Sequence, residues 1–173
     1  MNPRRRIVYC IDTSSFIYCQ KSFGERLSRL VLYKPVWDLL DRLAADGQLT
    51  APHLVYVEIT KNKDHVGVWA ANHAGSFRPK GEHADRVLEI LKEPGQRLVD
   101  PLSPRGGEEA DPWVIALAEA INQSPPTLWE RDFATVVSEE VRQGGIRDIC
   151  VRRNVPHIDF AELLASEGLS VSL

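Results

Sequence analysis

The segment Ile7-Val-Tyr-Cys-Ile11-Asp12 carries the clearest structural signal in the chain. Five apolar residues, most of them common in β-strands, follow one another without a polar break, and an acidic residue ends the run. Such continuous apolar runs are typical of strands buried on both faces of a parallel sheet. The small polar residues 13–15 that follow are of the kind that begins helices. The segment therefore predicts a buried strand that leads into a helix, with Asp12 at the junction.

The alternation of strand and helix continues to the end of the chain. Further strands are predicted at residues 49–52, 97–100, 134–137 and 155–158. Helices are predicted from Phe16 and at residues 30–43, 54–69, 83–92, 110–121, 146–151 and 160–166, with loops at 71–81 and 101–107. Strands that alternate with helices favour a doubly wound α/β domain around a parallel sheet. With 173 residues and no recognisable linker or repeat, we expect one domain over residues 1–173.

Composition narrows the class of protein. Hydrophobic residues make up 43% of the chain and charged residues 26%, a balance typical of soluble globular proteins. The net charge of -3 argues against a protein that binds nucleic acid through bulk positive charge, although it permits a local basic rim. No phosphate-binding glycine motif, HExxH or GxSxG sequence occurs. ATP-binding, zinc-protease and serine-hydrolase chemistry therefore have no support.

The cysteines and the hydropathy pattern bear on the compartment. Cys10, Cys19 and Cys150 are too few and too scattered for a disulfide framework or a zinc ribbon. Apolar runs all fall short of the roughly 18 residues that cross a membrane. We therefore expect a protein of the reducing cytoplasm with no membrane association.

Four acidic residues are predicted to share one edge of the sheet. Asp12 directly follows the first strand, and Glu140 lies just beyond the strand that ends at Val137. Asp111 begins a helix, and Glu58 lies early in the helix that follows the strand 49–52. In open α/β sheets, ligands bind beyond the carboxyl ends of the strands. The four carboxylates are thus expected to converge, although they are far apart in sequence.

Each acid also has an ordinary structural interpretation. Asp12 could cap the helix after it, and Asp111 before Pro112 has the sequence of a helix cap. Glu58 alone would be a solvated helix residue, and Glu140, next to Glu139, would be surface charge. Only the joint placement of the four at one edge favours a site.

Taken together, these segments resemble the PIN domain, a family of metal-dependent ribonucleases. The matching motifs are Ile7-Val-Tyr-Cys-Ile-Asp-Thr-Ser14, Val55-Tyr-Val-Glu-Ile59, Ala110-Asp-Pro-Trp-Val-Ile-Ala-Leu-Ala118 and Val136-Val-Ser-Glu-Glu140. Their order and spacing match over nearly the whole chain. The sequences of these motifs are most similar to those of a prokaryotic PIN-like branch related to the toxins of toxin–antitoxin pairs. One departure is that Glu140 stands where most PIN domains have Asp, so Glu139 is an alternative for the fourth acid.

The resemblance implies a fold, a cofactor and an activity. The fold is a three-layer α/β/α sandwich with a central, mainly parallel sheet. The activity is that of an endoribonuclease that uses Mg²⁺ or Mn²⁺, with Asp12 and Asp111 as direct ligands and Glu58 and Glu140 bound through water or to a second ion. Thr13, Ser14 and Ser138 are expected to hydrogen-bond the ligands or a phosphate. The expected partners are RNA, a cognate antitoxin protein and a second copy of the chain.

RNA would also need basic or aromatic side chains around the acids. Arg142, Arg147, Arg78 and Lys80 are the candidates for phosphate contacts. Trp69 and Trp113 are candidates for stacking on bases, with core packing favoured for Trp113. A dimer face is expected in the apolar stretch 27–40, which could equally be core.

A different class of function stays open. The modest net charge and the unusual fourth acid would also suit a catalytically weak or inactive PIN-like module that binds RNA or a protein without cutting.

Overall fold

The central sheet has five strands, all parallel, in the order β3-β2-β1-β4-β5. The structure is a computed structural model that describes residues 4–24, 27–99 and 109–170. The strands are β1 (Arg4–Ile11), β2 (Leu49–Pro52), β3 (Phe77–Arg78), β4 (Glu130–Val137) and β5 (His157–Ile158). The predicted α/β class and parallel sheet are confirmed.

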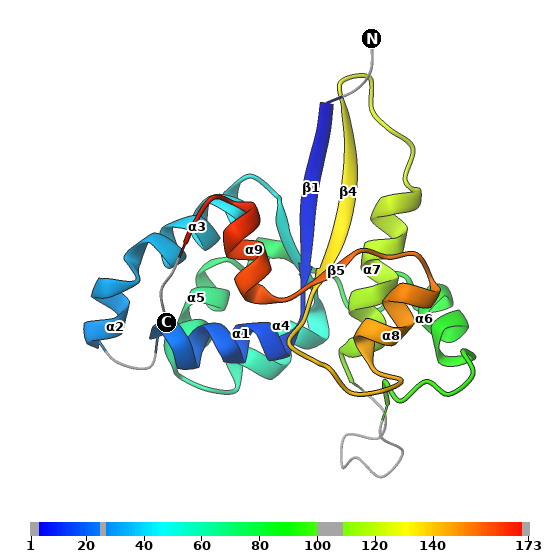
Figure 1. The fold of residues 1–173 in the computed structure, drawn as a ribbon, viewed down its shortest axis with the longest axis horizontal. Helices are drawn as coiled ribbons and strands as arrows, with labels where there is room; N and C mark the ends of the chain where they lie inside the picture. The colour runs from blue at the N-terminus through cyan, green and yellow to red at the C-terminus, as the bar shows by residue number, and fades with distance from the viewer. Residues whose placement is uncertain (1–3, 25–26, 100–108, 171–173) are drawn as a thin grey trace.

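Helices cover both faces of this sheet, so the predicted three-layer sandwich is also confirmed (Figure 1). One layer holds α6 (Ala84–Leu91), α7 (Asp111–Gln123) and α8 (Ile146–Arg152), on the right in Figure 1. The other holds α1 (Thr13–Cys19), α2 (Leu27–Leu32), α3 (Lys34–Ala45), α4 (His53–Thr60), α5 (His65–Asn72) and α9 (Phe160–Ser166). A π-helical turn, η1 (Gln20–Gly24), and a 3-10 turn, η2 (Ala74–Ser76), complete the described elements.

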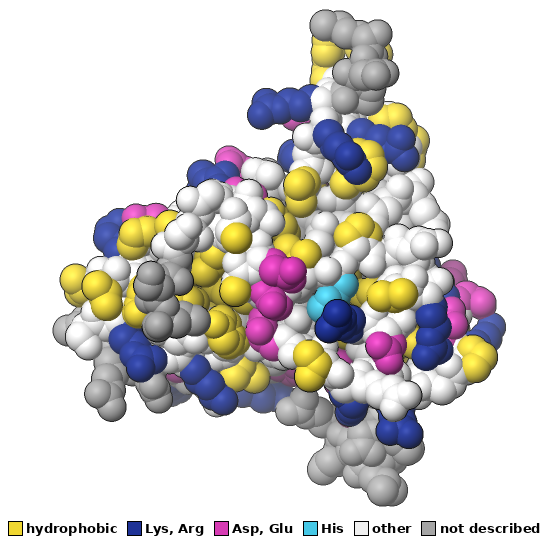
Figure 2. Space-filling model, in the orientation of Figure 1, with side chains coloured by type: hydrophobic (Ala, Val, Ile, Leu, Met, Phe, Trp, Pro, Cys, Tyr) yellow, Lys and Arg dark blue, Asp and Glu magenta, His cyan; other side chains and the backbone are white. Residues whose placement is uncertain are grey.

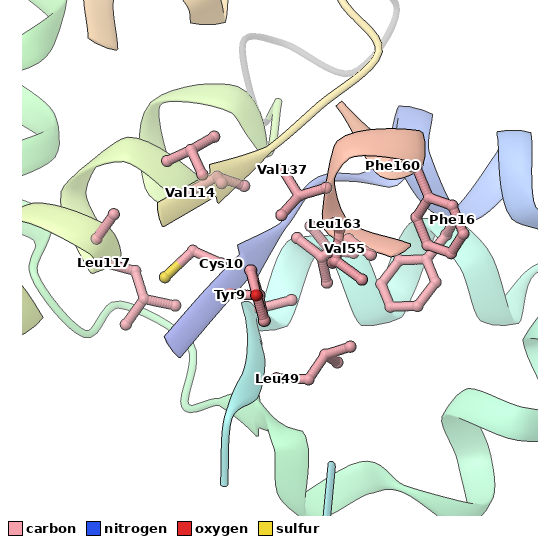
Figure 3. Close-up of a cluster of buried hydrophobic side chains, with 14 of the residues drawn as sticks. Tyr9, Cys10, Phe16, Leu49, Val55, Val114, Leu117, Val137, Phe160 and Leu163 are labelled. Atoms are coloured by element: carbon pink, nitrogen blue, oxygen red, sulfur yellow. The ribbon is translucent and has the colours of Figure 1, made fainter. Parts of the chain in front are cut away.

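The core lies on both sides of β1, as its unbroken apolar run predicts. Successive side chains of a strand point to opposite faces. Cys10 lies toward Val114 and Leu117 of α7, whereas the rings of Phe16 and Phe160 pack on the other face (Figure 3). Val8 to Ile11 are all at most 3% exposed. The three cysteines are buried and free.

Strands β1 and β4 begin earlier than the sequence predicts. The apolar run predicts starts at residues 7 and 134, but the strands pair from Arg4 and Glu130 onward. Their first residues are charged because this end projects beyond the helical layers (Figure 1). Cross-strand pairs such as Arg6 with Asp132 take the place of apolar packing there.

Two predicted helices are each divided in two. The segment 30–43 divides into α2 and α3, because Pro35 has no N–H to continue a helix and occupies the first turn of α3. The segment 54–69 divides into α4 and α5. Asp64 caps α5 by accepting a hydrogen bond from the Gly67 N–H at 2.9 Å, and a side chain at Gly67 would meet the Asn62 carbonyl.

Two further expectations are wrong in part. Residues 97–99 form no strand, and Asp100 and the predicted loop 101–107 lie outside the described residues. The predicted loop 71–81 contains η2 and the short edge strand β3. In the part of the chain that the structure describes, every helix is too short or too polar to cross a membrane.

The topology fixes where a ligand would bind. The chain adds β2 and β3 on one side of β1, then crosses to add β4 and β5 on the other. The strand order therefore reverses between β1 and β4, and in open α/β sheets the crevice at such a reversal holds the ligand. The carboxyl ends of β1 and β4 meet in register there, with Ile11 opposite Val137.

Candidate functional site

The register of β1 and β4 brings Asp12 next to the turn that carries Glu139 and Glu140. The Asp12 N–H donates to the Val137 carbonyl at 2.9 Å, which extends the ladder by one residue. The Ser138 hydroxyl lies 3.3 Å from Asp12 Oδ2, and the Glu140 N–H donates to Ser138 Oγ at 3.1 Å. One hydroxyl thus joins the end of β1 to the turn after β4.

The two carboxylate oxygens of Asp12 have different surroundings. Oδ2 accepts from the Ser14 N–H at 3.2 Å and the Ser14 hydroxyl at 2.7 Å, so Asp12 does cap α1. Oδ1 is buried and has no hydrogen-bond partner among the described residues. The whole side chain is only 4% exposed. A buried carboxylate oxygen without a partner costs free energy, and a bound cation would offset that cost.

Asp111 does not cap its helix, which corrects the structural alternative for this residue. The N-cap is Ala110, no side chain caps this helix, and Asp111 is the first residue of α7. Burial raises the pKa of the Asp111 carboxyl, and the negative charges of Asp12 and Glu140 raise it further. The Asp111 carboxylate therefore lies close enough to other acids for their charges to act on it.

Glu139 and Glu140 point to different places. Glu139 Oε1 accepts from the Phe160 N–H at 2.8 Å and the Ser15 hydroxyl at 3.2 Å, so it is held against the start of α9. Glu140 lies close enough to Asp111 for its charge to raise the Asp111 pKa. The geometry thus favours Glu140 over Glu139 as the acid that accompanies Asp12 and Asp111.

Glu58 lies on the other side of Asp12. It accepts a hydrogen bond from the Thr13 hydroxyl, and together with Asp64 it borders a cavity of about 210 Å³ between α1 and α4. Among the described residues, the acids that raise the Asp111 pKa are Asp12, Glu140 and Glu109. The structure therefore brings three of the four predicted acids together and connects Glu58 to them through Thr13.

A basic side chain already contacts the acids. Arg142 Nε donates to Glu140 Oε1 at 2.8 Å, and Arg142 Nη2 lies 3.9 Å from Asp111 Oδ2. The other Glu140 oxygen accepts from the Ile146 N–H at 3.1 Å. Within the described ranges, no group of three His, Cys, Asp or Glu side chains is positioned to hold a metal ion as it stands. The donor set is nevertheless of the kind that suits a hard cation, because it consists of carboxylates: Asp12, with one unpartnered oxygen, and Asp111, whose pKa the charge of Asp12 raises.

The other predicted RNA contacts are dispersed. Arg147 lies near His157 of β5, while Arg78 pairs with Glu82 at 2.8 Å and Lys80 lies close by. In Figure 2 acidic side chains gather at the middle of the face near a histidine, and a basic side chain lies directly beside that histidine. The other basic side chains in this view are dispersed toward the outline and the projecting strand ends.

The two tryptophans differ in exposure. Trp69 is 5% exposed, and its indole N–H donates to Asp41 at 2.8 Å, so its expected stacking on bases is wrong. Trp113 is half-buried and packs against the hydrophobic core, as favoured, and it also borders a cavity beside the acidic edge. Sequence reasoning did not find this cavity, because its walls come from segments far apart in the chain.

An α/β protein with an acidic site at the strand-order reversal is thus the class that fold and site define. The chain belongs to the family described as "Domain of unknown function (DUF4411)", whose model matches residues 9–171. None of the curated proteins compared with the chain matches it.

Proposed function

We propose that this protein is an endoribonuclease that depends on Mg²⁺ or Mn²⁺. The observation that carries the proposal is the buried, unpartnered Asp12 Oδ1 at the strand-order reversal, close to Asp111, whose carboxyl has a raised pKa. Ligand sites commonly combine such perturbed acids with a position beyond the strand ends.

Asp12 and Asp111 would hold the ion, with Glu140 and Glu58 beside them. Magnesium and manganese prefer oxygen ligands, and magnesium retains several bound waters. When bound, such an ion supplies an activated water and stabilises charge on a phosphodiester.

The neighbouring side chains have positioning roles in this proposal. Ser14 and Ser138 hold Asp12 Oδ2, so Oδ1 would remain free to bind the ion. The Thr13 hydroxyl orients Glu58. Arg142, which pairs with Glu140, would also pair with a phosphate of the RNA.

The resemblance of the four motifs to PIN domains supports RNA as the substrate. By the same analogy the biological role is that of a toxin paired with an antitoxin protein in the cytoplasm. A second copy of the chain would pack on α2, where Val31 and Leu32 are 72% and 69% exposed.

Cleavage of single-stranded RNA with Mn²⁺ tests the proposal. The wild-type protein should cut, and Asp12→Asn or Asp111→Asn should lower the rate at least a hundredfold, because each removes a charge from the ligand set. Asp132→Asn, at the opposite end of the sheet, is the matched control. Equal rates in wild type and both site variants would contradict the proposal.

A binding module without cleavage is the second candidate. Arg142 Nε donates to Glu140 Oε1 at 2.8 Å, so an internal cation already pairs with this acid. Calorimetric titration with Mn²⁺ separates the two functions. Heat of binding that is lost in Asp12→Asn supports the nuclease, whereas no binding at millimolar Mn²⁺ supports the module.

A further inference from the structure

A second cavity opens on the same edge of the sheet as the acids. Its volume is about 340 Å³. Its walls include Pro52 and His53 at the end of β2, Lys80 after β3, and Trp113 of α7. We call it the edge cavity. Because the carboxyl ends of β2 and β3 border it, the edge cavity and the acids share the edge at which α/β sheets bind ligands.

The edge cavity adjoins the acidic site through the backbone of α7. Asp111, Pro112 and Trp113 are consecutive. The last two line the cavity, while Arg142, which pairs with Glu140, lies 3.9 Å from the carboxylate of the first. A group bound in the cavity would therefore be a neighbour of any ligand bound by Asp111.

The walls are apolar and partly aromatic. Val87 and Leu117 form apolar parts of the lining, and the half-buried Trp113 adds an indole. The ring of His53 stacks on Tyr56 at a centroid distance of 6.0 Å, and Tyr56 in turn contacts Phe77. Flat, supported walls of this kind suit a planar ring, since bases stack on aromatic side chains with little dependence on sequence.

The rim carries positive charge. Lys80 is exposed and makes no ion pair or hydrogen bond with another described residue. Arg78 lies beside it, paired with Glu82. A planar apolar wall with a cationic rim is complementary to a base and its phosphate. A volume near 340 Å³ lies at the small end of ligand pockets and excludes an α-helix, which is about 10 Å across.

We propose that the edge cavity binds one unpaired nucleobase of the RNA, with Lys80 on a neighbouring phosphate, so that the adjoining phosphodiester lies at Asp111. The proposal rests on the proposed function and specifies its substrate as single-stranded at this position. A paired base could not enter, because its edge and both faces are occupied within a duplex.

Nucleotide binding without metal tests the edge cavity apart from catalysis. The probes are the four nucleoside 5′-monophosphates, compared with ribose 5-phosphate, in an NMR titration with EDTA. At least one nucleotide should bind tenfold more tightly than ribose 5-phosphate. The proposal is overturned if none binds more tightly than the sugar phosphate.

Two pairs of variants locate the binding. Ala84→Phe would fill the cavity from an exposed position, and it should weaken nucleotide binding at least tenfold. Ala71→Phe, an equally exposed alanine on α5, should change it less than twofold. Leu88→Glu, which places a carboxylate at the cavity from a side chain 57% exposed, should weaken binding about fivefold, while Val68→Glu, at 53%, should not. Wild-type affinity in both cavity variants would overturn the proposal.

The same assays separate this proposal from the nuclease. If wild type cuts RNA with Mn²⁺ but binds no nucleotide, the edge cavity proposal is wrong and the nuclease is retained. If nucleotides bind in the cavity and no RNA is cut, the cavity site is supported and the nuclease is contradicted.

Discussion

Strands β1 and β4 pair along their whole length, yet the charged side chains at their two ends are arranged differently: opposite charges pair at the amino end, and acids gather at the carboxyl end. At the projecting amino end, Arg6 donates two hydrogen bonds of 2.8 Å to Asp132, and the Arg5 guanidinium lies 4.0 Å from the Phe133 ring centre. At the carboxyl end, Asp12 and Asp111 lie near each other, and one Asp12 oxygen has no hydrogen-bond partner among the described residues.

The difference shows in the two aspartates. The hydrogen bond from Arg6 lowers the pKa of Asp132, because the pair favours the charged form. Burial and like charge raise the pKa of Asp111. The ion pair at the amino end stabilises the fold by itself. At the carboxyl end Arg142 pairs with Glu140 and lowers the Asp111 pKa, but burial and the charges of Asp12 and Glu140 outweigh it. Perturbed acids of this kind are common at ligand sites, which is why the proposed ion is assigned to this end.

Removing the charge of Asp111 should have the largest effect on stability. The pKa of Asp111 is raised in the folded protein. The wild type is therefore most stable below the ordinary pKa of an aspartate, and it loses stability as the pH rises through the raised pKa of Asp111. Asp111→Asn should therefore be more stable than wild type in EDTA at pH 8, by about 2 kcal/mol. The gain should disappear toward pH 4. Thermal unfolding followed by circular dichroism measures it.

Manganese should reverse that order. Wild type should gain melting temperature with millimolar Mn²⁺, since a ligand of the folded state stabilises it, and Asp111→Asn should gain little. If Asp111→Asn were less stable than wild type in EDTA at pH 8, the Asp111 carboxylate would have a stabilising partner. The two ends of the strands would then not differ in the way described.

Glu139 and Glu140 are neighbours in one turn, yet we expect Glu140 to affect RNA cleavage and Glu139 to affect stability. Glu140→Gln should lower RNA cleavage about tenfold, or about 1.4 kcal/mol in the barrier. Glu139→Gln should leave the rate within threefold but lower stability by about 1 kcal/mol, because it weakens the bond to the Phe160 N–H. Single-turnover rates and urea unfolding give the two readouts. The opposite assignment of effects would make Glu139 the acid of the site.

The smallest expected effect is at the amino end. Asp132 has a lowered pKa, so its contribution is present above the ordinary pKa and is lost as pH falls through the folded-state value. Asp132→Asn should cost about 0.5 kcal/mol at pH 7, as expected for a partly exposed pair, and nothing near pH 2. Urea titrations at both pH values measure this. A loss of RNA cleavage in this variant would contradict its use as a control.

The parts predicted correctly from sequence are those with local signals. The apolar runs of β1 and β4 predict buried strands, and Asp12 and Glu140 were placed at one edge because parallel strands end together. The closing helix is predicted at 160–166 and observed with the same bounds, and in the structure Asp159 begins a complete capping box there.

The parts that were missed depend on distant partners. β3 has only two residues, Phe77 and Arg78, and exists because β2 lies beside it. The charged starts of β1 and β4 form strands because each supplies the other's ion pairs. That Asp111 does not cap α7 could be seen only in the structure of the helix start. The edge cavity could be found only once the arrangement of several distant segments was known.

Anomalous diffraction from crystals soaked in millimolar Mn²⁺ tests the central claim most directly. The account predicts a manganese peak at Asp12 Oδ1 and the Asp111 carboxylate, at the carboxyl ends of β1 and β4. Ordered, solvent-accessible carboxylates without a manganese peak, or a peak only elsewhere on the surface, would contradict it.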